Sequence, residues 1–156
     1  MGFFSRASLG NFGFRWLHIL AGITWIGLLY YFNAVQTPAL AVAAADKGGP
    51  GGAGISKYVA PRALFWFRWS ALVTWLSGAW YLGAHFPGAF TLGLTSDPVN
   101  YYHMVIGTGA WLGTIMLFNV WVLIWPNQKK VLGIVVATDE QKAAARVVAG
   151  NASRVN

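Results

Sequence analysis

The sequence predicts an all-α integral membrane protein with three transmembrane helices. Composition, the length of the apolar runs and the placement of basic residues each support this fold class. Hydrophobic residues make up 56% of the 156 residues and charged residues only 10%, whereas a soluble domain carries about 25% charged residues. A chain of this length has too little interior to hide so much apolar surface from water. We therefore expect one transmembrane domain over residues 1–156, with the lipid bilayer as its surroundings.

Three apolar runs carry the expected transmembrane helices, over about residues 14–36, 63–86 and 101–125. At about 1.5 Å rise per residue, each run crosses a hydrocarbon core of roughly 30 Å. The first run is too long and too aromatic for a cleavable signal peptide, and no small-residue cleavage site follows it. A turn precedes the third helix, which we expect Asp97 or Asn100 to cap.

The chain becomes polar after Pro126. The stretch "TDEQKAAARVVA" (138–149) begins with Thr-Asp-Glu, a sequence typical of a helix start. We expect a short C-terminal helix here, outside the membrane.

Basic residues are divided unequally between the two sides of the predicted bundle. Nine of the eleven lie in the first loop and early second helix, or after the third helix, and only Arg6 and Arg15 lie on the other side. The positive-inside rule then predicts a bacterial inner (cytoplasmic) membrane protein with a periplasmic N-terminus and a cytoplasmic C-terminal tail. Nucleic acid is not an expected partner, because the basic residues flank apolar runs and fit loop anchors better.

An internal repeat links the first and third helices. "WIGLLYYFN" (25–33) and "WLGTIMLFN" (111–119) share the pattern W-[IL]-G-x4-F-N, and "APR" (60–62) is echoed by "ASR" (152–154). These matches predict a direct repeat of a helical pair, since repeated units bury each other's faces. The three helices then form most of a four-helix bundle, whose fourth helix begins at or beyond residue 156 or comes from a partner.

The three histidines fall at the same predicted depth, in the outer leaflet. His18 is followed four residues later by Gly22, and His103 by Gly107, so each histidine has a patch without a side chain on its own helix face. A flat macrocycle held by two imidazoles needs this arrangement. The spacing therefore predicts one b-type haem between the first and third helices near the periplasmic leaflet, with His18 and His103 as iron ligands.

Two further residues lie near this predicted site. His85 is a weaker ligand candidate, because Tyr81 on its face would crowd the plane of a ring. Arg15 lies one turn before His18 and would pair with haem propionates or extend to lipid headgroups. Two interpretations stay open beside haem: interfacial histidines with no cofactor, and three imidazoles that hold zinc or copper.

Several function classes are excluded by absent residue types. The chain has no cysteine, which excludes disulfides, a thiolate-held metal and a c-type haem of its own. All four acidic residues lie in loops or the tail, so no buried carboxylate pair is available for acid–base catalysis. The glycine-rich connector over residues 46–54 lacks the Lys-Ser/Thr of a phosphate-binding loop.

Three tryptophan-rich strings, "RWLHILAGITWIGLLYYFN", "KYVAPRALFWFRWSALVTWLSG" and "LFNVWVLIWPNQKKVLG", carry a resemblance that covers almost the whole chain. Together they resemble the membrane-embedded N-terminal domain of the bacterial cytochrome-linked urate oxidase family, including its short stand-alone members. The resemblance implies electron transfer from the membrane part towards a periplasmic cytochrome. In those relatives the segment after "ASR" continues into another apolar helix.

Three functions follow as hypotheses. The first is a membrane electron-transfer subunit that binds one haem b and passes electrons between a membrane donor and a periplasmic cytochrome. The alternative is a cofactor-free structural or accessory subunit of a larger respiratory or photosynthetic membrane complex. The third, the membrane domain of a purine (urate) oxidase, is implied by the resemblance alone.

Overall fold

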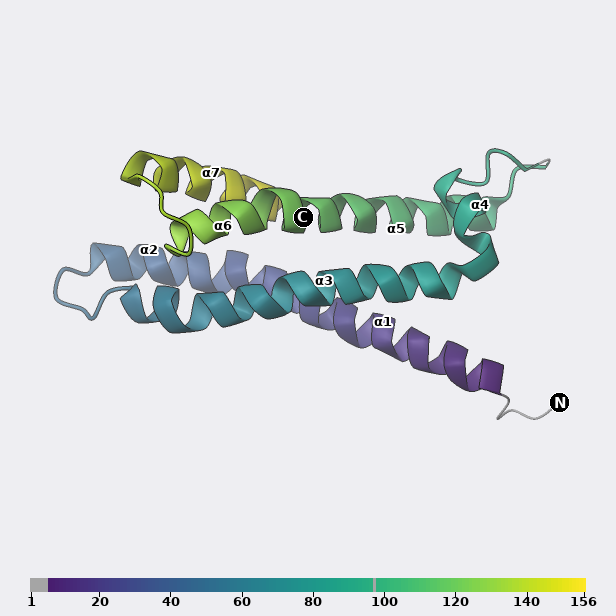
Figure 1. Cartoon of the computed structure of the whole chain (residues 1–156), viewed down its shortest axis with the longest axis horizontal. Coiled ribbons are helices and arrows are strands. Elements are labelled where there is room, and N and C mark those ends of the chain that lie inside the picture. The colour runs from purple at the N-terminus through teal and green to yellow at the C-terminus, as the bar shows by residue number, and fades with distance from the viewer. Residues whose placement is uncertain (1–5, 97) are drawn as a thin grey trace.

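The computed structural model describes residues 6–96 and 98–156, and in this part of the chain all regular structure is helical. The all-α prediction is therefore confirmed for the described residues. The molecule is elongated: α1 crosses α3 at an angle, and α5 runs along the opposite side of α3 (Figure 1). In chain order the elements are α1 (Arg6–Tyr30), η1 (Tyr31–Gln36), α2 (Thr37–Ala45), η2 (Ile55–Val59), α3 (Ala60–Leu82), η3 (Gly83–His85), α4 (Phe86–Phe90), α5 (Tyr101–Phe118), η4 (Asn119–Ile124), α6 (Trp125–Val131) and α7 (Asp139–Val155).

The boundaries of the long helices differ from the predicted ones. The predicted helix over 14–36 is part of a continuous helix of α1, η1 and α2, and the predicted helix over 101–125 continues through η4 into α6. The predicted helix over 63–86 begins earlier, through η2 into α3, and ends earlier, at Leu82. His85 therefore lies beyond the end of α3, in the 3₁₀ turn η3.

Prolines lie where the helices continue beyond the predicted boundaries. Three π-helical segments, η1, η2 and η4, each lead into an α-helix with a proline in its first two positions: Pro38, Pro61 and Pro126. A proline inside an α-helix removes one hydrogen bond and clashes with the preceding turn. The wider π turn relieves that clash, so these helices continue past prolines that a sequence pattern marks as helix ends.

The end of α3 depends on glycine. Gly83 has φ +50° and ψ −121°, a backbone conformation that side chains with a Cβ rarely adopt. The chain leaves the helix there and forms η3 and the short helix α4, which packs against α5. The α4 segment therefore lies between the ends of α3 and α5.

The hydrophobic core joins α1, α3 and η4. Trp25 of α1 packs with Leu64, Phe67 and Ala71 of α3 and with Val120 of η4. The Phe32 and Phe67 rings meet edge to face, with centroids 5.4 Å apart.

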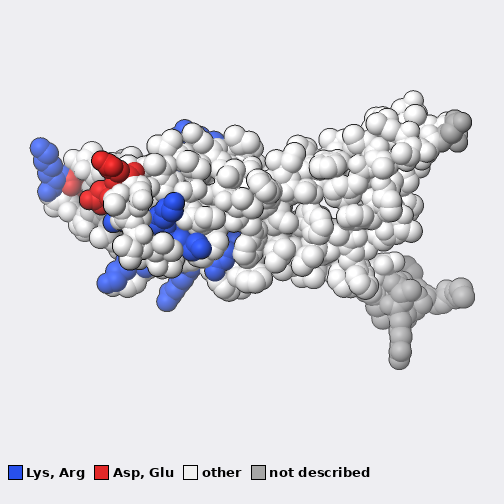
Figure 2. All heavy atoms as spheres, turned by 45° about the horizontal axis from the view of Figure 1, so that its top comes forward, with Lys and Arg blue, Asp and Glu red and all other residues white. Residues whose placement is uncertain are grey.

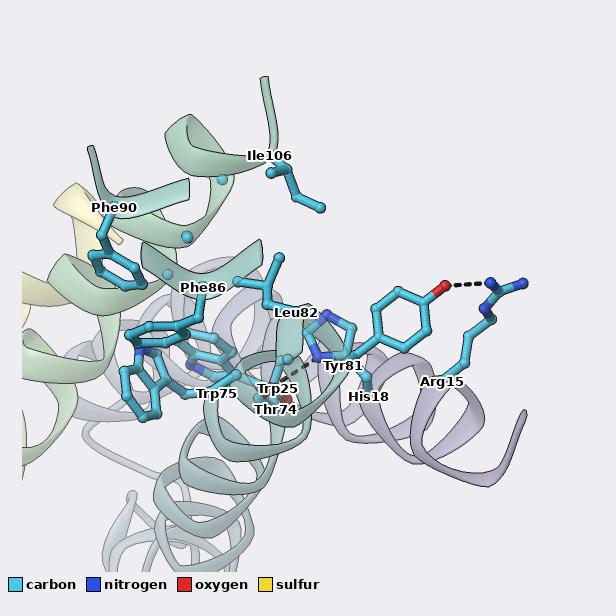
Figure 3. Close-up of a pocket in the computed structure, with 15 residues that line it drawn as sticks. Arg15, His18, Trp25, Thr74, Trp75, Tyr81, Leu82, Phe86, Phe90 and Ile106 are labelled. Carbon is cyan, nitrogen blue, oxygen red and sulfur yellow. Dashed lines mark hydrogen bonds between the residues drawn. The ribbon is translucent and has the colours of Figure 1, made fainter. Parts of the chain in front are cut away.

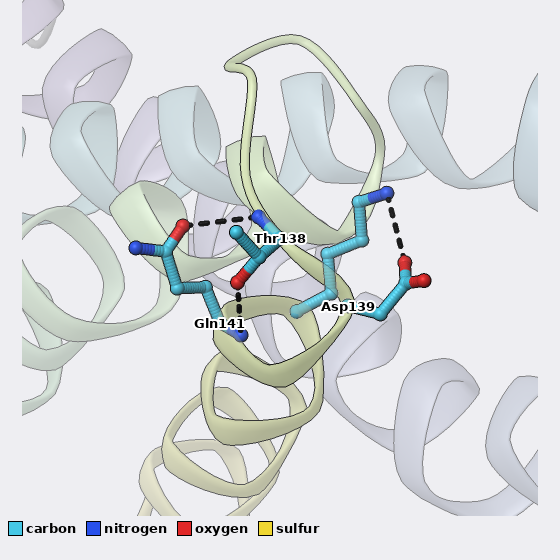
Figure 4. Close-up of polar contacts among 4 residues, drawn as sticks. Thr138, Asp139 and Gln141 are labelled. Atoms are coloured by element: carbon cyan, nitrogen blue, oxygen red, sulfur yellow. Dashed lines mark hydrogen bonds and ion pairs between the residues drawn. The ribbon is translucent and has the colours of Figure 1, made fainter.

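The C-terminal helix was predicted correctly in position, although it is longer than the expected 138–149. Thr138 and Gln141 form a capping box (Figure 4). The main-chain N–H of Gln141 donates to the Thr138 hydroxyl, and the main-chain N–H of Thr138 donates to the side-chain oxygen of Gln141. Three alanines face the rest of the bundle, where α7 packs on α6 and η4: Ala145, Ala149 and Ala152.

The two repeated motifs end in the same local structure. Asn33 lies in the π segment η1 and Asn119 in the π segment η4, and each donates a hydrogen bond to the end of α7. The partners are Ser153 Oγ, 3.0 Å from Asn33 Nδ2, and Asn156 Oδ1, 2.9 Å from Asn119 Nδ2. Both motifs thus end in a π segment whose asparagine bonds to the C-terminal end of the chain.

Two helices of the described part of the chain are long and apolar enough to cross a membrane, Gly10–Ala45 and Tyr101–Val131. Only 11% and 17% of their most apolar windows are buried within the molecule, unlike the core helix of a soluble protein. The span expected over 63–86 is not among them, so three transmembrane helices stay a prediction. Figure 2 shows Lys and Arg side chains gathered over the half of the molecule that contains α2, α6 and α7.

Candidate functional site

A cavity of about 340 Å³ lies between α1, α3, α4 and α5 (Figure 3). On α1 its walls extend from Arg15 to Trp25, about 15 Å along the helix axis. Aromatic and aliphatic side chains form most of the wall. Elsewhere the wall is formed by small residues of α3 and α5: Gly78, Gly109, Ala110 and Gly113. The cavity is therefore a long, mainly apolar slot with few polar groups.

His18 is the imidazole in this cavity, and its orientation is fixed by α3. Its Nδ1 lies 2.8 Å from the carbonyl oxygen of Thr74 and 3.4 Å from the hydroxyl of Ser77. A carbonyl oxygen only accepts hydrogen bonds, so Nδ1 carries the proton and Nε2 keeps its lone pair. Metal-bound histidines usually donate their second N–H to such an acceptor. His18 is thus held as a ligand needs to be, with Nε2 available.

Gly78 allows the His18 ring to lie against α3. A Cβ atom at position 78 would lie 2.9 Å from His18 Cε1 and 3.1 Å from Nδ1. A larger residue would displace the ring from the Thr74 carbonyl.

Trp25 forms part of the cavity wall at its deeper end on α1. Its side chain is buried, and its Nε1 has no hydrogen-bond partner among the described residues. An unpaired buried N–H costs about 1–3 kcal/mol.

Arg15 and Tyr81 lie together at one end of the cavity (Figure 3). The Arg15 guanidinium donates a hydrogen bond to the Tyr81 hydroxyl, and its Cζ lies 5.2 Å from the centre of the Tyr81 ring. Tyr81 was expected to crowd a ring beside His85, but it contacts Arg15 instead. This end of the slot therefore carries a cation beside a phenol.

His103 lies away from this cavity and pairs with His85. His103 Nε2 is 3.1 Å from His85 Nδ1, and the His103 ring packs against Gly88 of α4. The sequence paired His103 with His18 and placed His85 last. The structure instead brings His103 and His85 together, because η3 and α4 carry His85 towards α5.

The environment of His103 suits a hydrogen-bonded pair better than a metal ligand. Its Nδ1 is buried and has no partner in the described part of the chain. If Nε2 held a metal, Nδ1 would have to carry an unpaired buried proton, at a cost of about 1–3 kcal/mol. With Nε2 donating to His85, Nδ1 keeps only a lone pair. His103 therefore lacks the supporting acceptor that Thr74 gives His18.

The glycines four residues after the histidines have packing roles. A Cβ on Gly22 would make an ordinary 3.8 Å contact with Thr74 Cγ2, and one on Gly107 would lie 2.0 Å from the carbonyl oxygen of Ala89. Neither glycine lines the cavity. Gly107 permits α4 to lie directly on α5, and its predicted role under a ring plane stays a prediction.

The zinc or copper interpretation finds no support in the described residues, which contain no cluster of three or more His, Asp or Glu side chains. Sequence reasoning missed Trp25, Thr74 and Gly78. The sequence does contain a signal for Trp25, because this residue follows His18 by seven residues, or two helical turns along the same helix face. Thr74 acts through its main-chain carbonyl and leaves no sequence signal.

Comparison with known proteins gives one family. The family model described as "Urate oxidase N-terminal" matches residues 6–95, which include α1 and α3 with Arg15 and His18. The match is shorter than the almost complete coverage expected from sequence, and the third tryptophan-rich string lies outside it. No curated protein matches the chain. No solved structure matches it either.

Proposed function

Since the chain belongs to the urate oxidase N-terminal family, we propose that it is a membrane electron-transfer subunit that binds one haem b through His18. The observation that carries the proposal is the His18–Thr74 hydrogen bond, which leaves Nε2 free beside an apolar slot. A b-type haem needs such a combination: an oriented imidazole, a slot without side chains and a polar end for its propionates.

The proposal places α1–α2, α3 and α5–α6 across a bacterial inner membrane, with the N-terminus periplasmic. Two observations support this orientation. Few residues in the most apolar windows of the long helices are buried within the molecule, as expected for helices in contact with lipid, and nine of the eleven basic residues fall at the end that contains α2, α6 and α7. The positive-inside rule then puts that end in the cytoplasm. Arg15 and His18 come to the periplasmic side, within reach of a soluble cytochrome.

Each polar residue of the slot has a role in holding the haem. His18 binds the iron through Nε2, and the Thr74 carbonyl fixes its tautomer. Arg15, with Tyr81, offers a cation to the propionates. The bound haem would supply a one-electron couple between ferrous and ferric iron. His103 has no part in this site.

The haem experiment uses the full chain purified in detergent. Reduced-minus-oxidised visible spectra and a pyridine haemochrome assay are expected to give about one haem b per chain. His18→Ala is expected to lose the Soret band, whereas His103→Ala keeps it. Because His18 is the imidazole that lines the slot, added imidazole should shift the wild-type spectrum towards the low-spin form. A wild type without haem, or equal loss in both variants, would overturn the proposal.

A second candidate is a cofactor-free accessory subunit of a respiratory or photosynthetic complex. One observation favours it: Cβ atoms on Gly109 and Gly113 would meet nothing within 4 Å, so a partner helix could pack closely there. Under this alternative a colourless chain co-purifies with other membrane subunits, and His18→Ala leaves that assembly intact.

The third candidate function, purine oxidation, is supported only by the name of the family. Urate-dependent reduction of a cytochrome by membranes that contain the chain would support it, and membranes with His18→Ala are the matched control.

A further inference from the structure

Two cations from two helices converge on one indole ring near the basic end of the molecule. The guanidinium carbon of Arg68 in α3 lies 3.7 Å from the centre of the Trp125 ring, and the ammonium of Lys129 in α6 lies 5.8 Å from the same centre. Contacts of this kind hold a cation in place without neutralising it. The arrangement therefore places two positive charges near one indole ring.

The site around Arg68 is built from aromatic groups. Trp121 Nε1 donates to the carbonyl oxygen of Arg68 at 3.2 Å, and the Trp69 and Trp121 rings meet edge to face with centroids 5.5 Å apart. These contacts tie α3 to η4 at the level of Arg68. The guanidinium is thus presented by a packed frame at a defined depth.

No carboxylate of the described residues neutralises either cation. In that part of the chain the single ion pair joins Lys142 and Asp139. Arg68 lies eight residues after the start of α3, or about 12 Å along the helix. A guanidinium at such a depth in a membrane helix requires an anion or a path to the headgroups.

We propose that Arg68 and Lys129 together bind the phosphate of an anionic phospholipid headgroup. This inference rests on the membrane orientation in the proposed function and is independent of haem. The planar guanidinium can donate two parallel hydrogen bonds to phosphate oxygens, and the Lys129 ammonium adds a second positive charge. Two cations against one phosphate favour a headgroup without a compensating positive charge. Headgroup phosphates of the cytoplasmic leaflet lie at the same end as these residues.

The experiment measures thermal unfolding of the full chain in detergent with added lipid. The probes are phosphatidylglycerol, phosphatidylcholine and inorganic phosphate at equal phosphate concentration. Phosphatidylglycerol is expected to raise the Tm of the wild type more than the other two. Arg68→Gln and Lys129→Gln should each lose at least half of that rise, and the double variant little more. Lys47→Gln, which removes the same charge from an exposed connector, is the matched control and should keep the full rise.

Native mass spectrometry gives a readout that does not depend on stability. The wild type and Lys47→Gln are expected to retain one more phosphatidylglycerol than Lys129→Gln, and Arg68→Lys replaces Arg68→Gln if that variant fails to fold. Equal retention by all variants, or an equal Tm rise with phosphatidylcholine, would overturn the proposal. An equal rise with inorganic phosphate would assign the site to a soluble anion instead. A wild type that lacks haem but keeps this lipid response removes the haem proposal alone.

Discussion

The Nδ1 atom of His18 lies 2.8 Å from the main-chain carbonyl oxygen of Thr74, and this contact distinguishes His18 from the other two histidines. His85 and His103 bind each other, and the second ring nitrogen of His103 is buried without a partner. Three imidazoles at similar predicted depth therefore have two different kinds of environment. The one oriented by a carbonyl acceptor lies in a cavity, which is why the proposed haem site depends on His18.

Gly78→Ala tests whether the position of the His18 ring matters for ligand binding. The new methyl group would lie 2.9 Å from His18 Cε1, so the ring must move and the bond to Thr74 must weaken. We expect haem content to fall several-fold, with a modest loss of stability of about 1 kcal/mol, at the low end for overpacking. The measurement is the ratio of Soret to protein absorbance after purification. Gly27→Ala on α1 is the control, since its Cβ would meet nothing within 4 Å. Unchanged haem content in Gly78→Ala would show that haem binding does not depend on the position of the His18 ring.

Gly107→Ala tests the close contact between α4 and α5. A Cβ there would lie 2.0 Å from the Ala89 carbonyl oxygen, which is main chain and cannot move without shifting α4. We expect the free energy of unfolding to fall by about 2–3 kcal/mol, as for overpacking in a tight core. The matched control is Gly150→Ala in α7, where a Cβ has open space and the substitution should stabilise by about 0.5–1 kcal/mol. Denaturation in detergent followed by circular dichroism compares the two variants. Equal stability would show that α4 does not pack on Gly107.

Thr138→Ala tests the capping box of α7. The substitution removes the hydroxyl that accepts from the Gln141 amide, and the typical cost of losing such a cap is about 1 kcal/mol. Amide hydrogen exchange is expected to speed up in the first turn of α7. Thr138→Ser keeps the hydroxyl and should exchange like the wild type. Faster exchange in both variants would point to lost packing of the threonine methyl group.

The sequence was sufficient to predict that the chain is helical, and insufficient for the turns between the helices. The predicted boundaries are the ends of apolar runs, and they fall near Pro38, Pro61 and Pro126, whereas π turns carry the helices past all three. Thr138 was found because a cap has a local signature. A change from α-helical (i+4) to π-helical (i+5) hydrogen bonds has no such local signature in the sequence.

The sequence pairs His18 with His103, whereas the structure brings His85 to His103, and the difference has a related reason. Equal depth in a membrane fixes the height of a side chain but not the direction in which it points around its helix. The path of the chain after Gly83, with φ +50°, decides that His85 reaches His103. No periodicity records that path, because it depends on how α4 packs on Gly107.

His85→Ala tests the hydrogen bond between His85 and His103. Removing the His85 ring leaves His103 Nε2 without its acceptor, while His103 Nδ1 is already unpaired. Because His85 is exposed, water replaces part of the lost bond, so we expect a cost of about 1 kcal/mol, within the usual net value of one hydrogen bond. Hydrogen exchange over residues 83–100 should increase, since η3, α4 and the following loop lose their contact with α5. His103→Phe removes both ring nitrogens and keeps a ring against Gly88, so it should disturb this segment less than His85→Ala. Neither variant should change the spectrum of a haem held by His18. The opposite order of exchange rates would show that packing of the His103 ring, and not its hydrogen bond to His85, holds the segment on α5.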